Sequence, residues 1–263
     1  MNDAVADIAA GCQSRGTQGL QTVASPRRPG ATGPLAPEDG CCGVTGVILV
    51  GGKSRRMGQD KAFMEIAGRP LFEQVLNLFQ ECFTRVILVG DRAERFAGYG
   101  LPCLPDLYPG SALGGLHAGL FYSETERVFV APCDLPFPNR ELLRHLCSLS
   151  GDFDAVVPKG DQGYEPLFAL YHKSCLAPLE RLLKSGNYRI YDAFAQLRVL
   201  YLTGEELHRL DREEKSFVNL NTMEQFARTA ELPVAGERLY REPQHYTVGV
   251  HDEAVQHQPT KDG

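Results

Sequence analysis

The stretch V-I-L-V-G-G-K-S-R-R-M-G-Q-D-K, residues 47–61, decides the fold of this chain. It begins with the apolar run 47–50, which has the length and composition of a buried β-strand, and continues directly into Gly51 and Gly52. Adjacent glycines let the backbone turn sharply and approach a ligand without interference from a Cβ atom. Because ligands of α/β sheets bind at the carboxyl ends of strands, the glycines and the basic residues after them predict an anion-binding loop on such a sheet.

Two common phosphate-binding loops do not match this stretch. A Walker A loop ending at Gly52-Lys53-Ser54 would need glycine at position 47, where the chain has Val47. A dinucleotide fingerprint fails as well, because the glycines fall at positions 51, 52 and 58. A glycine turn followed by a solvated basic stretch is the structural alternative to a ligand site.

The rest of the chain alternates between strand-like and helix-like patterns, which predicts helices on the faces of a mostly parallel sheet. No internal repeat is visible, and the last third is less regular. We predict an α/β fold with one doubly wound sheet, strands at 47–50, 86–89, 101–104, 128–130, 155–157 and 167–171, and helices at 70–83, 116–123, 140–149 and 175–184.

Both ends of the chain lack apolar periodicity. Residues 1–43 are rich in Gly, Pro, Ala and Gln, and residues 232–263 turn polar again. Segments of this composition cannot bury a core. We therefore predict a disordered tail over 1–43, a single α/β domain over 44–231 and a flexible tail over 232–263.

Charge and cysteine content narrow the class of protein. The formal net charge is -6, which argues against a broad basic surface for binding nucleic acid. Every apolar run is too short to span a bilayer. The eight cysteines form no C-x-x-C pair, so we expect reduced thiols in a cytoplasmic protein rather than a zinc site. Neighbouring Cys41 and Cys42 are badly placed for an ordinary disulfide.

Residues 49–61 match L-x-G-G-x-S-x-R-M-G-x-D-K, and on this signature the chain resembles the MobA-like nucleotidyltransferase family, which includes the molybdenum cofactor guanylyltransferases. The resemblance continues, in the order of the family, at 109–116, 132–136 and 217–222, so it covers about residues 44–230. It implies a Rossmann-like nucleotidyltransferase fold. A related cytidylyl branch usually has Ala-Ala-Gly where this chain has Val50-Gly51-Gly52, so the resemblance implies guanine more than cytosine.

The resemblance also implies roles for individual residues. Lys61 would place a point charge on the phosphates of the donor, and Arg56, with Arg55 less firmly, would offset the charge that develops on pyrophosphate. The nucleotide would contact Leu49, Val50, Gly51, Gly52, Lys61, Asp106 and Asp134.

Asp134 is the expected Mg²⁺ ligand. It follows a predicted strand and stands between Pro132 and Pro136, which stiffen the backbone around it. Mg²⁺ takes one or two carboxylates together with substrate phosphates and water. In the family the matching aspartate holds the metal that bridges the donor phosphates, whereas the structural alternative is an aspartate that caps the next helix.

Other positions leave alternatives open. Asp106 could be a turn carboxylate, and the N–H groups of Gly114 and Gly115 could either approach the nucleotide or serve packing. Relatives often have Asn at the end of the second strand, where this chain has Asp91, and this departure puts that contact in doubt.

On the acceptor side, the segments 165–168 and 219–222 match those that flank the pterin in relatives. Asn221 could equally cap a following helix. Tyr164 and Tyr188 could stack on a pterin, but surface tyrosines are common.

We interpret the chain as an enzyme that uses Mg²⁺ and GTP to attach GMP to the terminal phosphate of molybdopterin, releasing pyrophosphate. Within the same class, the alternative is a cytidylyltransferase or a sugar-phosphate nucleotidyltransferase. From another class, the alternative is a non-catalytic nucleotide-binding or cofactor-delivery module. We expect no nucleic acid or membrane partner, and transient contacts with molybdenum-insertion proteins or molybdoenzyme chaperones.

Overall fold

The computed structural model describes residues 41–51, 61–66, 68–149, 151–218 and 220. All of them belong to one compact unit that begins at Asp39. Apart from residues 41–43, the predicted tails lie outside the described residues, so their boundaries stay predictions. Within the described ranges, no helix combines the length and apolar character that crossing a bilayer requires.

A mostly parallel sheet forms the centre of the unit. Its strands follow the spatial order β10-β7-β9-β6-β1-β4-β5, and β8 forms a hairpin with β7. Only β9 and β8 run against their neighbours, and a short ribbon of β2 and β3 stands apart. The strands are β1 (Val44–Leu49), β2 (Glu65–Ile66), β3 (Arg69–Pro70), β4 (Arg85–Val89), β5 (Cys103–Leu104), β6 (Arg127–Pro132), β7 (Ala155–Gly160), β8 (Gly163–Tyr164), β9 (Ala169–His172) and β10 (Val199–Thr203).

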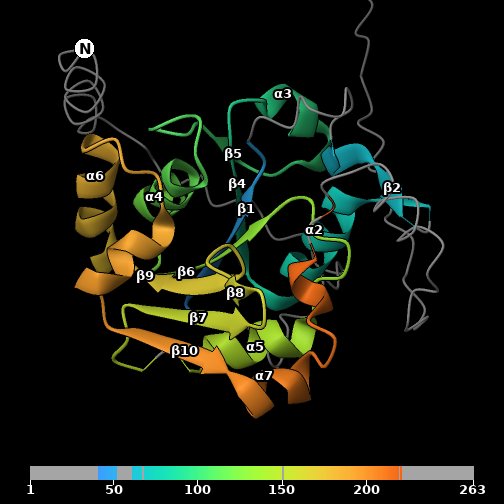
Figure 1. Ribbon diagram of the computed structural model, residues 1–263. Coiled ribbons are helices and arrows are strands. Elements are labelled where there is room, and N and C mark those ends of the chain that lie inside the picture. The colour runs from blue at the N-terminus through green and yellow to red at the C-terminus, as the bar shows by residue number, and fades with distance from the viewer. Residues whose placement is uncertain (1–40, 52–60, 67, 150, 219, 221–263) are drawn as a thin grey trace, which may run out of the picture. The chain divides into compact units, whose positions relative to one another are not determined.

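Helices cover both faces of this sheet, as a doubly wound fold requires (Figure 1). Buried residues of α2, α3, α5 and α7 pack on one face, and those of α4, α6 and η5 pack on the other. The helices are α2 (Leu71–Cys82), α3 (Ala93–Phe96), α4 (Ala112–Tyr122), α5 (Arg140–Ser148), α6 (Leu176–Lys184) and α7 (Gly204–Leu210), with 3-10 turns η2 (Lys61–Phe63), η3 (Ala97–Tyr99), η4 (Lys173–Cys175), η5 (Ile190–Gln196) and η6 (Lys215–Phe217). The predicted fold class is confirmed.

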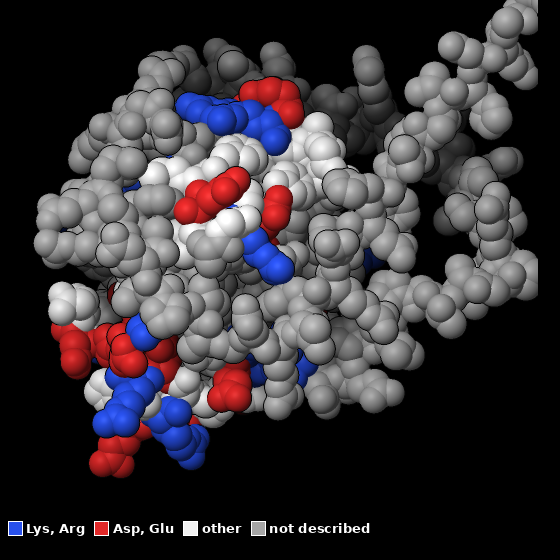
Figure 2. All heavy atoms as spheres, turned by 90° about the vertical axis from the view of Figure 1, so that its right-hand side faces the viewer, with Lys and Arg blue, Asp and Glu red and all other residues white. Residues whose placement is uncertain are grey.

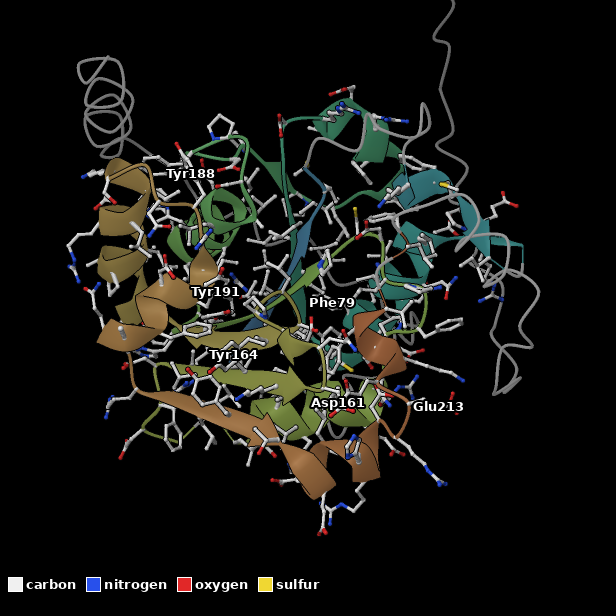
Figure 3. The ribbon with its side chains drawn as sticks, in the orientation of Figure 1. Phe79, Asp161, Tyr164, Tyr188, Tyr191 and Glu213 are labelled. Carbon is white, nitrogen blue, oxygen red and sulfur yellow. The ribbon has the colours of Figure 1, made fainter. Side chains whose placement is uncertain are left out.

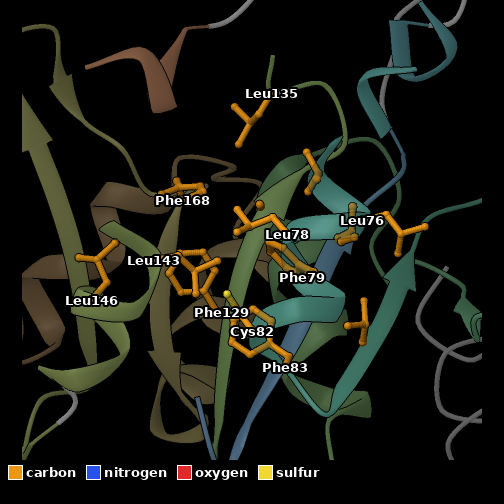
Figure 4. Packing of buried hydrophobic residues seen from close by; sticks show 14 of the residues in the cluster. Leu76, Leu78, Phe79, Cys82, Phe83, Phe129, Leu135, Leu143, Leu146 and Phe168 are labelled. Atoms are coloured by element: carbon orange, nitrogen blue, oxygen red, sulfur yellow. The ribbon is translucent and has the colours of Figure 1, made fainter. Parts of the chain in front are cut away.

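Aromatic side chains fill the core between the sheet and α2 (Figure 4). The ring of Phe129 on β6 lies 6.0 Å from Phe79 and 5.9 Å from Phe83, both contributed by the end of α2, and 5.0 Å from Phe168. Burial of a side chain of this size contributes about 1.5–3 kcal/mol, so this cluster fixes α2 firmly on the sheet.

The predicted helix over 116–123 begins too late, because the observed α4 starts at Ala112. Glycine lowers helix propensity, which hid the first turns of this helix. Tertiary packing overrides the propensity: a Cβ on Gly119 would stand 2.7 Å from a methyl of Val47, and one on Gly114 would stand 2.1 Å from the carbonyl oxygen of Tyr108. The helix needs these glycines to lie close to β1 and to the loop after β5.

The last third of the described chain is more regular than predicted. Strand β10 extends the sheet beside β7 over five residue pairs from Val199–Ala155 to Thr203–Lys159, and α7 packs against the same end of the sheet. The predicted helix 175–184 is confirmed as η4 and α6, whereas the helix expected after Asn221 lies outside the described residues.

Candidate active site

The carboxyl ends of four parallel strands meet at one edge of the sheet. Beyond the last residues of the strands the ladder continues, with Val50 N–H donating to Val89 O at 2.9 Å and Gly90 N–H to Leu104 O at 2.9 Å. On the other side of β1, Cys133 N–H donates to Leu49 O at 3.1 Å. The order of connection reverses between β1 and β6, and this is the point where α/β sheets bind ligands.

The turn after β1 lies tightly against the turn after β4. A Cβ on Gly90 would stand 2.8 Å from the backbone nitrogen of Gly51, and a Cβ on Gly51 would stand 3.1 Å from Oδ1 of Asp91. Both positions therefore favour glycine for close backbone approach. Gly51 is exposed at the edge, with the carboxylate of Asp91 beside it.

Asp106 follows β5 at the same edge and is half-buried. Its Oδ1 accepts a hydrogen bond from Tyr108 N–H at 2.8 Å. Burial raises the pKa of Asp106, the Tyr108 hydrogen bond lowers it, and the negative charge of Asp91 raises it further. Two carboxylates that repel each other in this way favour a ligand that brings hydrogen-bond donors or a cation, as a nucleotide with its metal does.

The N–H groups of Gly114 and Gly115 are engaged within α4. Ser111 caps this helix, since its Oγ accepts from Gly114 N–H at 3.0 Å and its carbonyl oxygen accepts from Gly115 N–H at 3.3 Å. Because both N–H groups already have partners inside the helix, the structure favours the packing alternative for these two glycines.

Asp134 is half-buried two residues after β6, and Leu135 behind it is 5% exposed. The alternative that Asp134 caps the next helix is excluded, because Asn139 caps α5 and its Oδ1 accepts from Leu142 N–H at 3.1 Å. Through β6 and the Cys133 hydrogen bond, Asp134 lies next to the end of β1. The same edge of the sheet therefore carries Leu49, Val50, Gly51, Asp106 and Asp134.

Lys61 opens η2, which packs on the α2 face of the sheet through the fully buried Ala62. Leu71 N–H donates to Met64 O at 2.9 Å and ties this turn to the start of α2. Gly52, Arg55 and Arg56 lie outside the described residues, as do Asn219 and Asn221, so their predicted roles stay predictions.

Glu165 lies at the same edge of the sheet, because it precedes β9, which runs antiparallel to β6 and therefore begins where β6 ends. The sequence did not predict the raised pKa of its carboxyl. The backbone of Glu165 is held on both sides, by its N–H to Pro158 O at 2.9 Å and by Phe168 N–H to its own carbonyl at 3.2 Å. Burial, and then the charge of Glu214, raise the pKa of Glu165 to about 7. No spacing in the sequence reveals this burial.

Of the two tyrosines proposed for stacking, Tyr164 is involved in other contacts. Tyr164 lies 5.0 Å from Tyr201 and 6.1 Å from Phe194, and the ammonium of Lys159 lies 5.1 Å from its ring centre. Tyr188 is more exposed and lies apart from Tyr164 in the view of Figure 3. These contacts give no preference for a pterin.

Basic and acidic side chains are interspersed on the face drawn in Figure 2, where the described residues present no continuous basic area.

A glycine turn and several carboxylates at the switch point of a doubly wound sheet define a nucleotide-binding α/β enzyme. Residues 46–199 match the MobA-like NTP transferase domain, and the chain belongs to this family. The fold, the signature and this match together make it a nucleotidyltransferase.

Relatives of known name extend over most of the described unit. The chain is 38% identical over 179 residues to a "probable molybdenum cofactor guanylyltransferase" of Pelotomaculum thermopropionicum, covering 68% of this chain and 87% of that protein. It is 32% identical over 199 residues to the molybdenum cofactor guanylyltransferase of Desulfosudis oleivorans, covering 74% and 98%. The crystal structure of molybdopterin-guanine dinucleotide biosynthesis protein A from Archaeoglobus fulgidus superposes with a TM-score of 0.64 at 32% identity, covering 71% of this chain and 97% of that one.

Proposed function

We propose that this enzyme transfers GMP from GTP to the terminal phosphate of molybdopterin, releasing pyrophosphate and forming the guanine dinucleotide cofactor. The observation that carries the proposal is the junction of β1 and β6, where the glycine turn and Asp134 leave adjacent strands that the Cys133–Leu49 hydrogen bond holds together at 3.1 Å. The choice of GTP as donor and of molybdopterin as acceptor follows from the names of the relatives.

The reaction needs positioning and charge compensation more than it needs a side-chain nucleophile. An oxygen of the acceptor phosphate attacks the α-phosphorus of GTP, a new P–O bond forms, and the bond to pyrophosphate breaks. The acceptor phosphate is already ionised at neutral pH. Backbone at Gly51 can lie against the triphosphate, and Lys61 and Arg56 are proposed to offset the charge that grows on the leaving pyrophosphate.

Asp134 fits a magnesium site by its surroundings. It is a half-buried carboxylate at the end of β6 and does not cap α5. Asp91 follows β4 and Asp106 follows β5, farther along the same edge beyond β1. When bound, Mg²⁺ neutralises charge on the triphosphate and makes the α-phosphorus more electrophilic. We propose that Asp134 holds the ion and that Asp106 contacts the nucleotide.

The direct test is pyrophosphate release from GTP and molybdopterin in the presence of Mg²⁺. Asp134→Asn keeps the size of the side chain but removes its charge, and we expect it to lower the rate by about 10²–10³-fold, the effect of losing one preorganised electrostatic group. Asp152→Asn is the matched control, because Asp152 is exposed and lies near the amino end of β7, away from this edge. Unchanged turnover in Asp134→Asn contradicts the assignment of the metal ligand.

The choice of nucleotide separates the proposal from its alternatives. GTP with Mg²⁺ should raise the midpoint of thermal unfolding, whereas CTP should not. Protection by CTP would favour a cytidylyltransferase. Protection by GTP without pyrophosphate release would favour a non-catalytic binding or delivery module.

We also propose that the enzyme works in the cytoplasm, a compartment that keeps free cysteines reduced. Transient contacts with molybdenum-insertion proteins or molybdoenzyme chaperones remain a prediction from the family resemblance, which co-purification from a molybdoenzyme-producing cell would test.

A further inference from the structure

The loop that carries Asp106 is fixed to the helices on one face of the sheet. Residues 105–111 connect β5 to α4, and Asp106 is the second residue after β5. Helices α4 and α6 cover the same face, where their buried residues share one hydrophobic cluster that Leu107 and Tyr108 join (Figure 1). The position of the loop therefore depends on these two helices as well as on the sheet.

The backbone of Tyr108 holds the carboxylate of Asp106. Tyr108 N–H donates to Oδ1 of Asp106 at 2.8 Å. Both groups also lie against Gly114 in the first turn of α4, where a Cβ would stand 2.1 Å from the carbonyl oxygen of Tyr108 and 2.8 Å from Oδ1 of Asp106. A shift of Tyr108 would therefore move the Asp106 carboxylate as well.

The side chain of Tyr108 contacts both helices. Its ring is nearly perpendicular to the imidazole of His117 on α4, and the ring centres are 5.2 Å apart. Its hydroxyl donates to Oε1 of Glu180 on α6 at 3.3 Å. The same oxygen accepts from Nζ of Lys184, one helical turn further on, at 2.9 Å. A charged acceptor strengthens such a hydrogen bond, so Glu180 anchors the end of the tyrosine side chain.

We propose that Tyr108 is a positioning residue for the nucleotide site, and that the hydrogen bond from its hydroxyl to Glu180 keeps the Asp106 carboxylate in place for GTP. This role rests on the proposed function, in which Asp106 contacts the nucleotide. A carboxylate that is already in place binds more tightly, because ordering it during binding costs free energy. The bond thereby makes GTP affinity depend on α6, a helix that the nucleotide need not touch.

The test is a calorimetric titration of the full chain with GTP and Mg²⁺. Tyr108→Phe keeps the ring beside His117 but removes the hydroxyl, and we expect the Kd for GTP to rise by about threefold to tenfold, the equilibrium effect of one lost hydrogen bond. Tyr191→Phe is the matched control, because Tyr191 is exposed on η5 and should bind GTP as the unchanged chain does.

Changing the other partner of the bond makes the test independent of one variant. Glu180→Ala should raise the Kd as much as Tyr108→Phe does. Glu180→Gln should restore most of the affinity, because its amide oxygen still accepts from the hydroxyl. The ion pair with Lys184 that glutamine loses is exposed and contributes little. Equal loss of affinity in the alanine and glutamine variants would overturn the role of this hydrogen bond.

Two double variants separate positioning from a general loss of packing. Tyr108→Phe combined with Glu180→Ala should raise the Kd no further than either change alone, because both break the same bond. Tyr108→Phe combined with Asp106→Ala should bind GTP as Asp106→Ala alone does, because the hydroxyl acts through Asp106. Additive effects in either pair overturn the positioning role.

The outcomes also distinguish this role from the proposed function. Absence of GTP binding by the unchanged chain contradicts the proposed function and the positioning role together. Normal GTP affinity in Tyr108→Phe overturns the positioning role alone. In the pyrophosphate-release assay, Tyr108→Phe should raise KM for GTP and leave KM for molybdopterin unchanged, and equal increases in both would likewise overturn it.

Discussion

Replacing Glu165 by glutamine is expected to remove a pH dependence from the stability of the fold. The carboxyl has a pKa of about 7 in the folded chain, because burial and then Glu214 disfavour its charged form, against a usual value of 4.5. The folded chain therefore binds more protons than the unfolded chain between these two values. The stability that Glu165 contributes is fully present below pH 4.5 and is lost as the pH rises through 7.

The two pKa values set the size of the effect. Their difference corresponds to roughly 3 kcal/mol of stability if the carboxyl were fully buried. Glu165 is only half-buried, so solvent screening reduces this to about 1–2 kcal/mol. Glutamine keeps the shape without titrating. Glu165→Gln should match the unchanged chain at pH 4.5 and be more stable by about 1–2 kcal/mol at pH 8.5.

Urea unfolding at a series of pH values measures the difference. Asp152→Asn serves as control, because Asp152 is exposed and should leave the pH dependence unaltered. Parallel curves for Glu165→Gln and the unchanged chain from pH 4.5 to 8.5 would show that the carboxyl is solvated and would refute the argument. A shifted curve would show that the Glu165 carboxyl changes charge near neutral pH in the folded chain.

Three further substitutions probe the framework around the site. Gly90→Ala places a Cβ 2.8 Å from the backbone nitrogen of Gly51, so we expect the free energy of unfolding to fall by about 1–3 kcal/mol and GTP binding to weaken. Gly98 has open space around it, so Gly98→Ala is the control and should bind GTP normally in calorimetry. Asn139→Ala removes the cap of α5 and should lower the free energy of unfolding, measured with urea, by about 1–2 kcal/mol. A change near zero would mean that water replaces the hydrogen bond of the cap. Phe129→Ala should lower the free energy of unfolding by about 3–5 kcal/mol, whereas the same change at the exposed Phe121 should lower it by less than about 1 kcal/mol. Similar decreases for both variants would contradict the assignment of Phe129 to the core.

The sequence predicted the first strand, the glycine turn and the aspartate after β6 because these features are local. An apolar run, a pair of glycines and a carboxylate between prolines need no distant partner to be recognised. The helices α2, α5 and α6 were found for the same reason, since each repeats its apolar residues along one face.

The start of α4 and the whole of β10 could not be predicted, because distant parts of the chain determine them. Gly114 and Gly119 weaken the helix locally. They are favoured by distant neighbours that leave no room for a Cβ, which are Tyr108 and Asp106 beside Gly114 and the side chain of Val47 beside Gly119. Strand β10 is stabilised by its pairing with β7, more than forty residues away in the chain.

By itself, the sequence determined that this chain builds a doubly wound nucleotidyltransferase domain with an anion-binding turn after its first strand, since fold class follows from apolar periodicity and the turn from residue identity. Only the tertiary structure decided the electrostatic state of Glu165 and which asparagine caps α5. Those properties depend on burial and on charges that approach from other strands and helices, and no spacing along the chain encodes them.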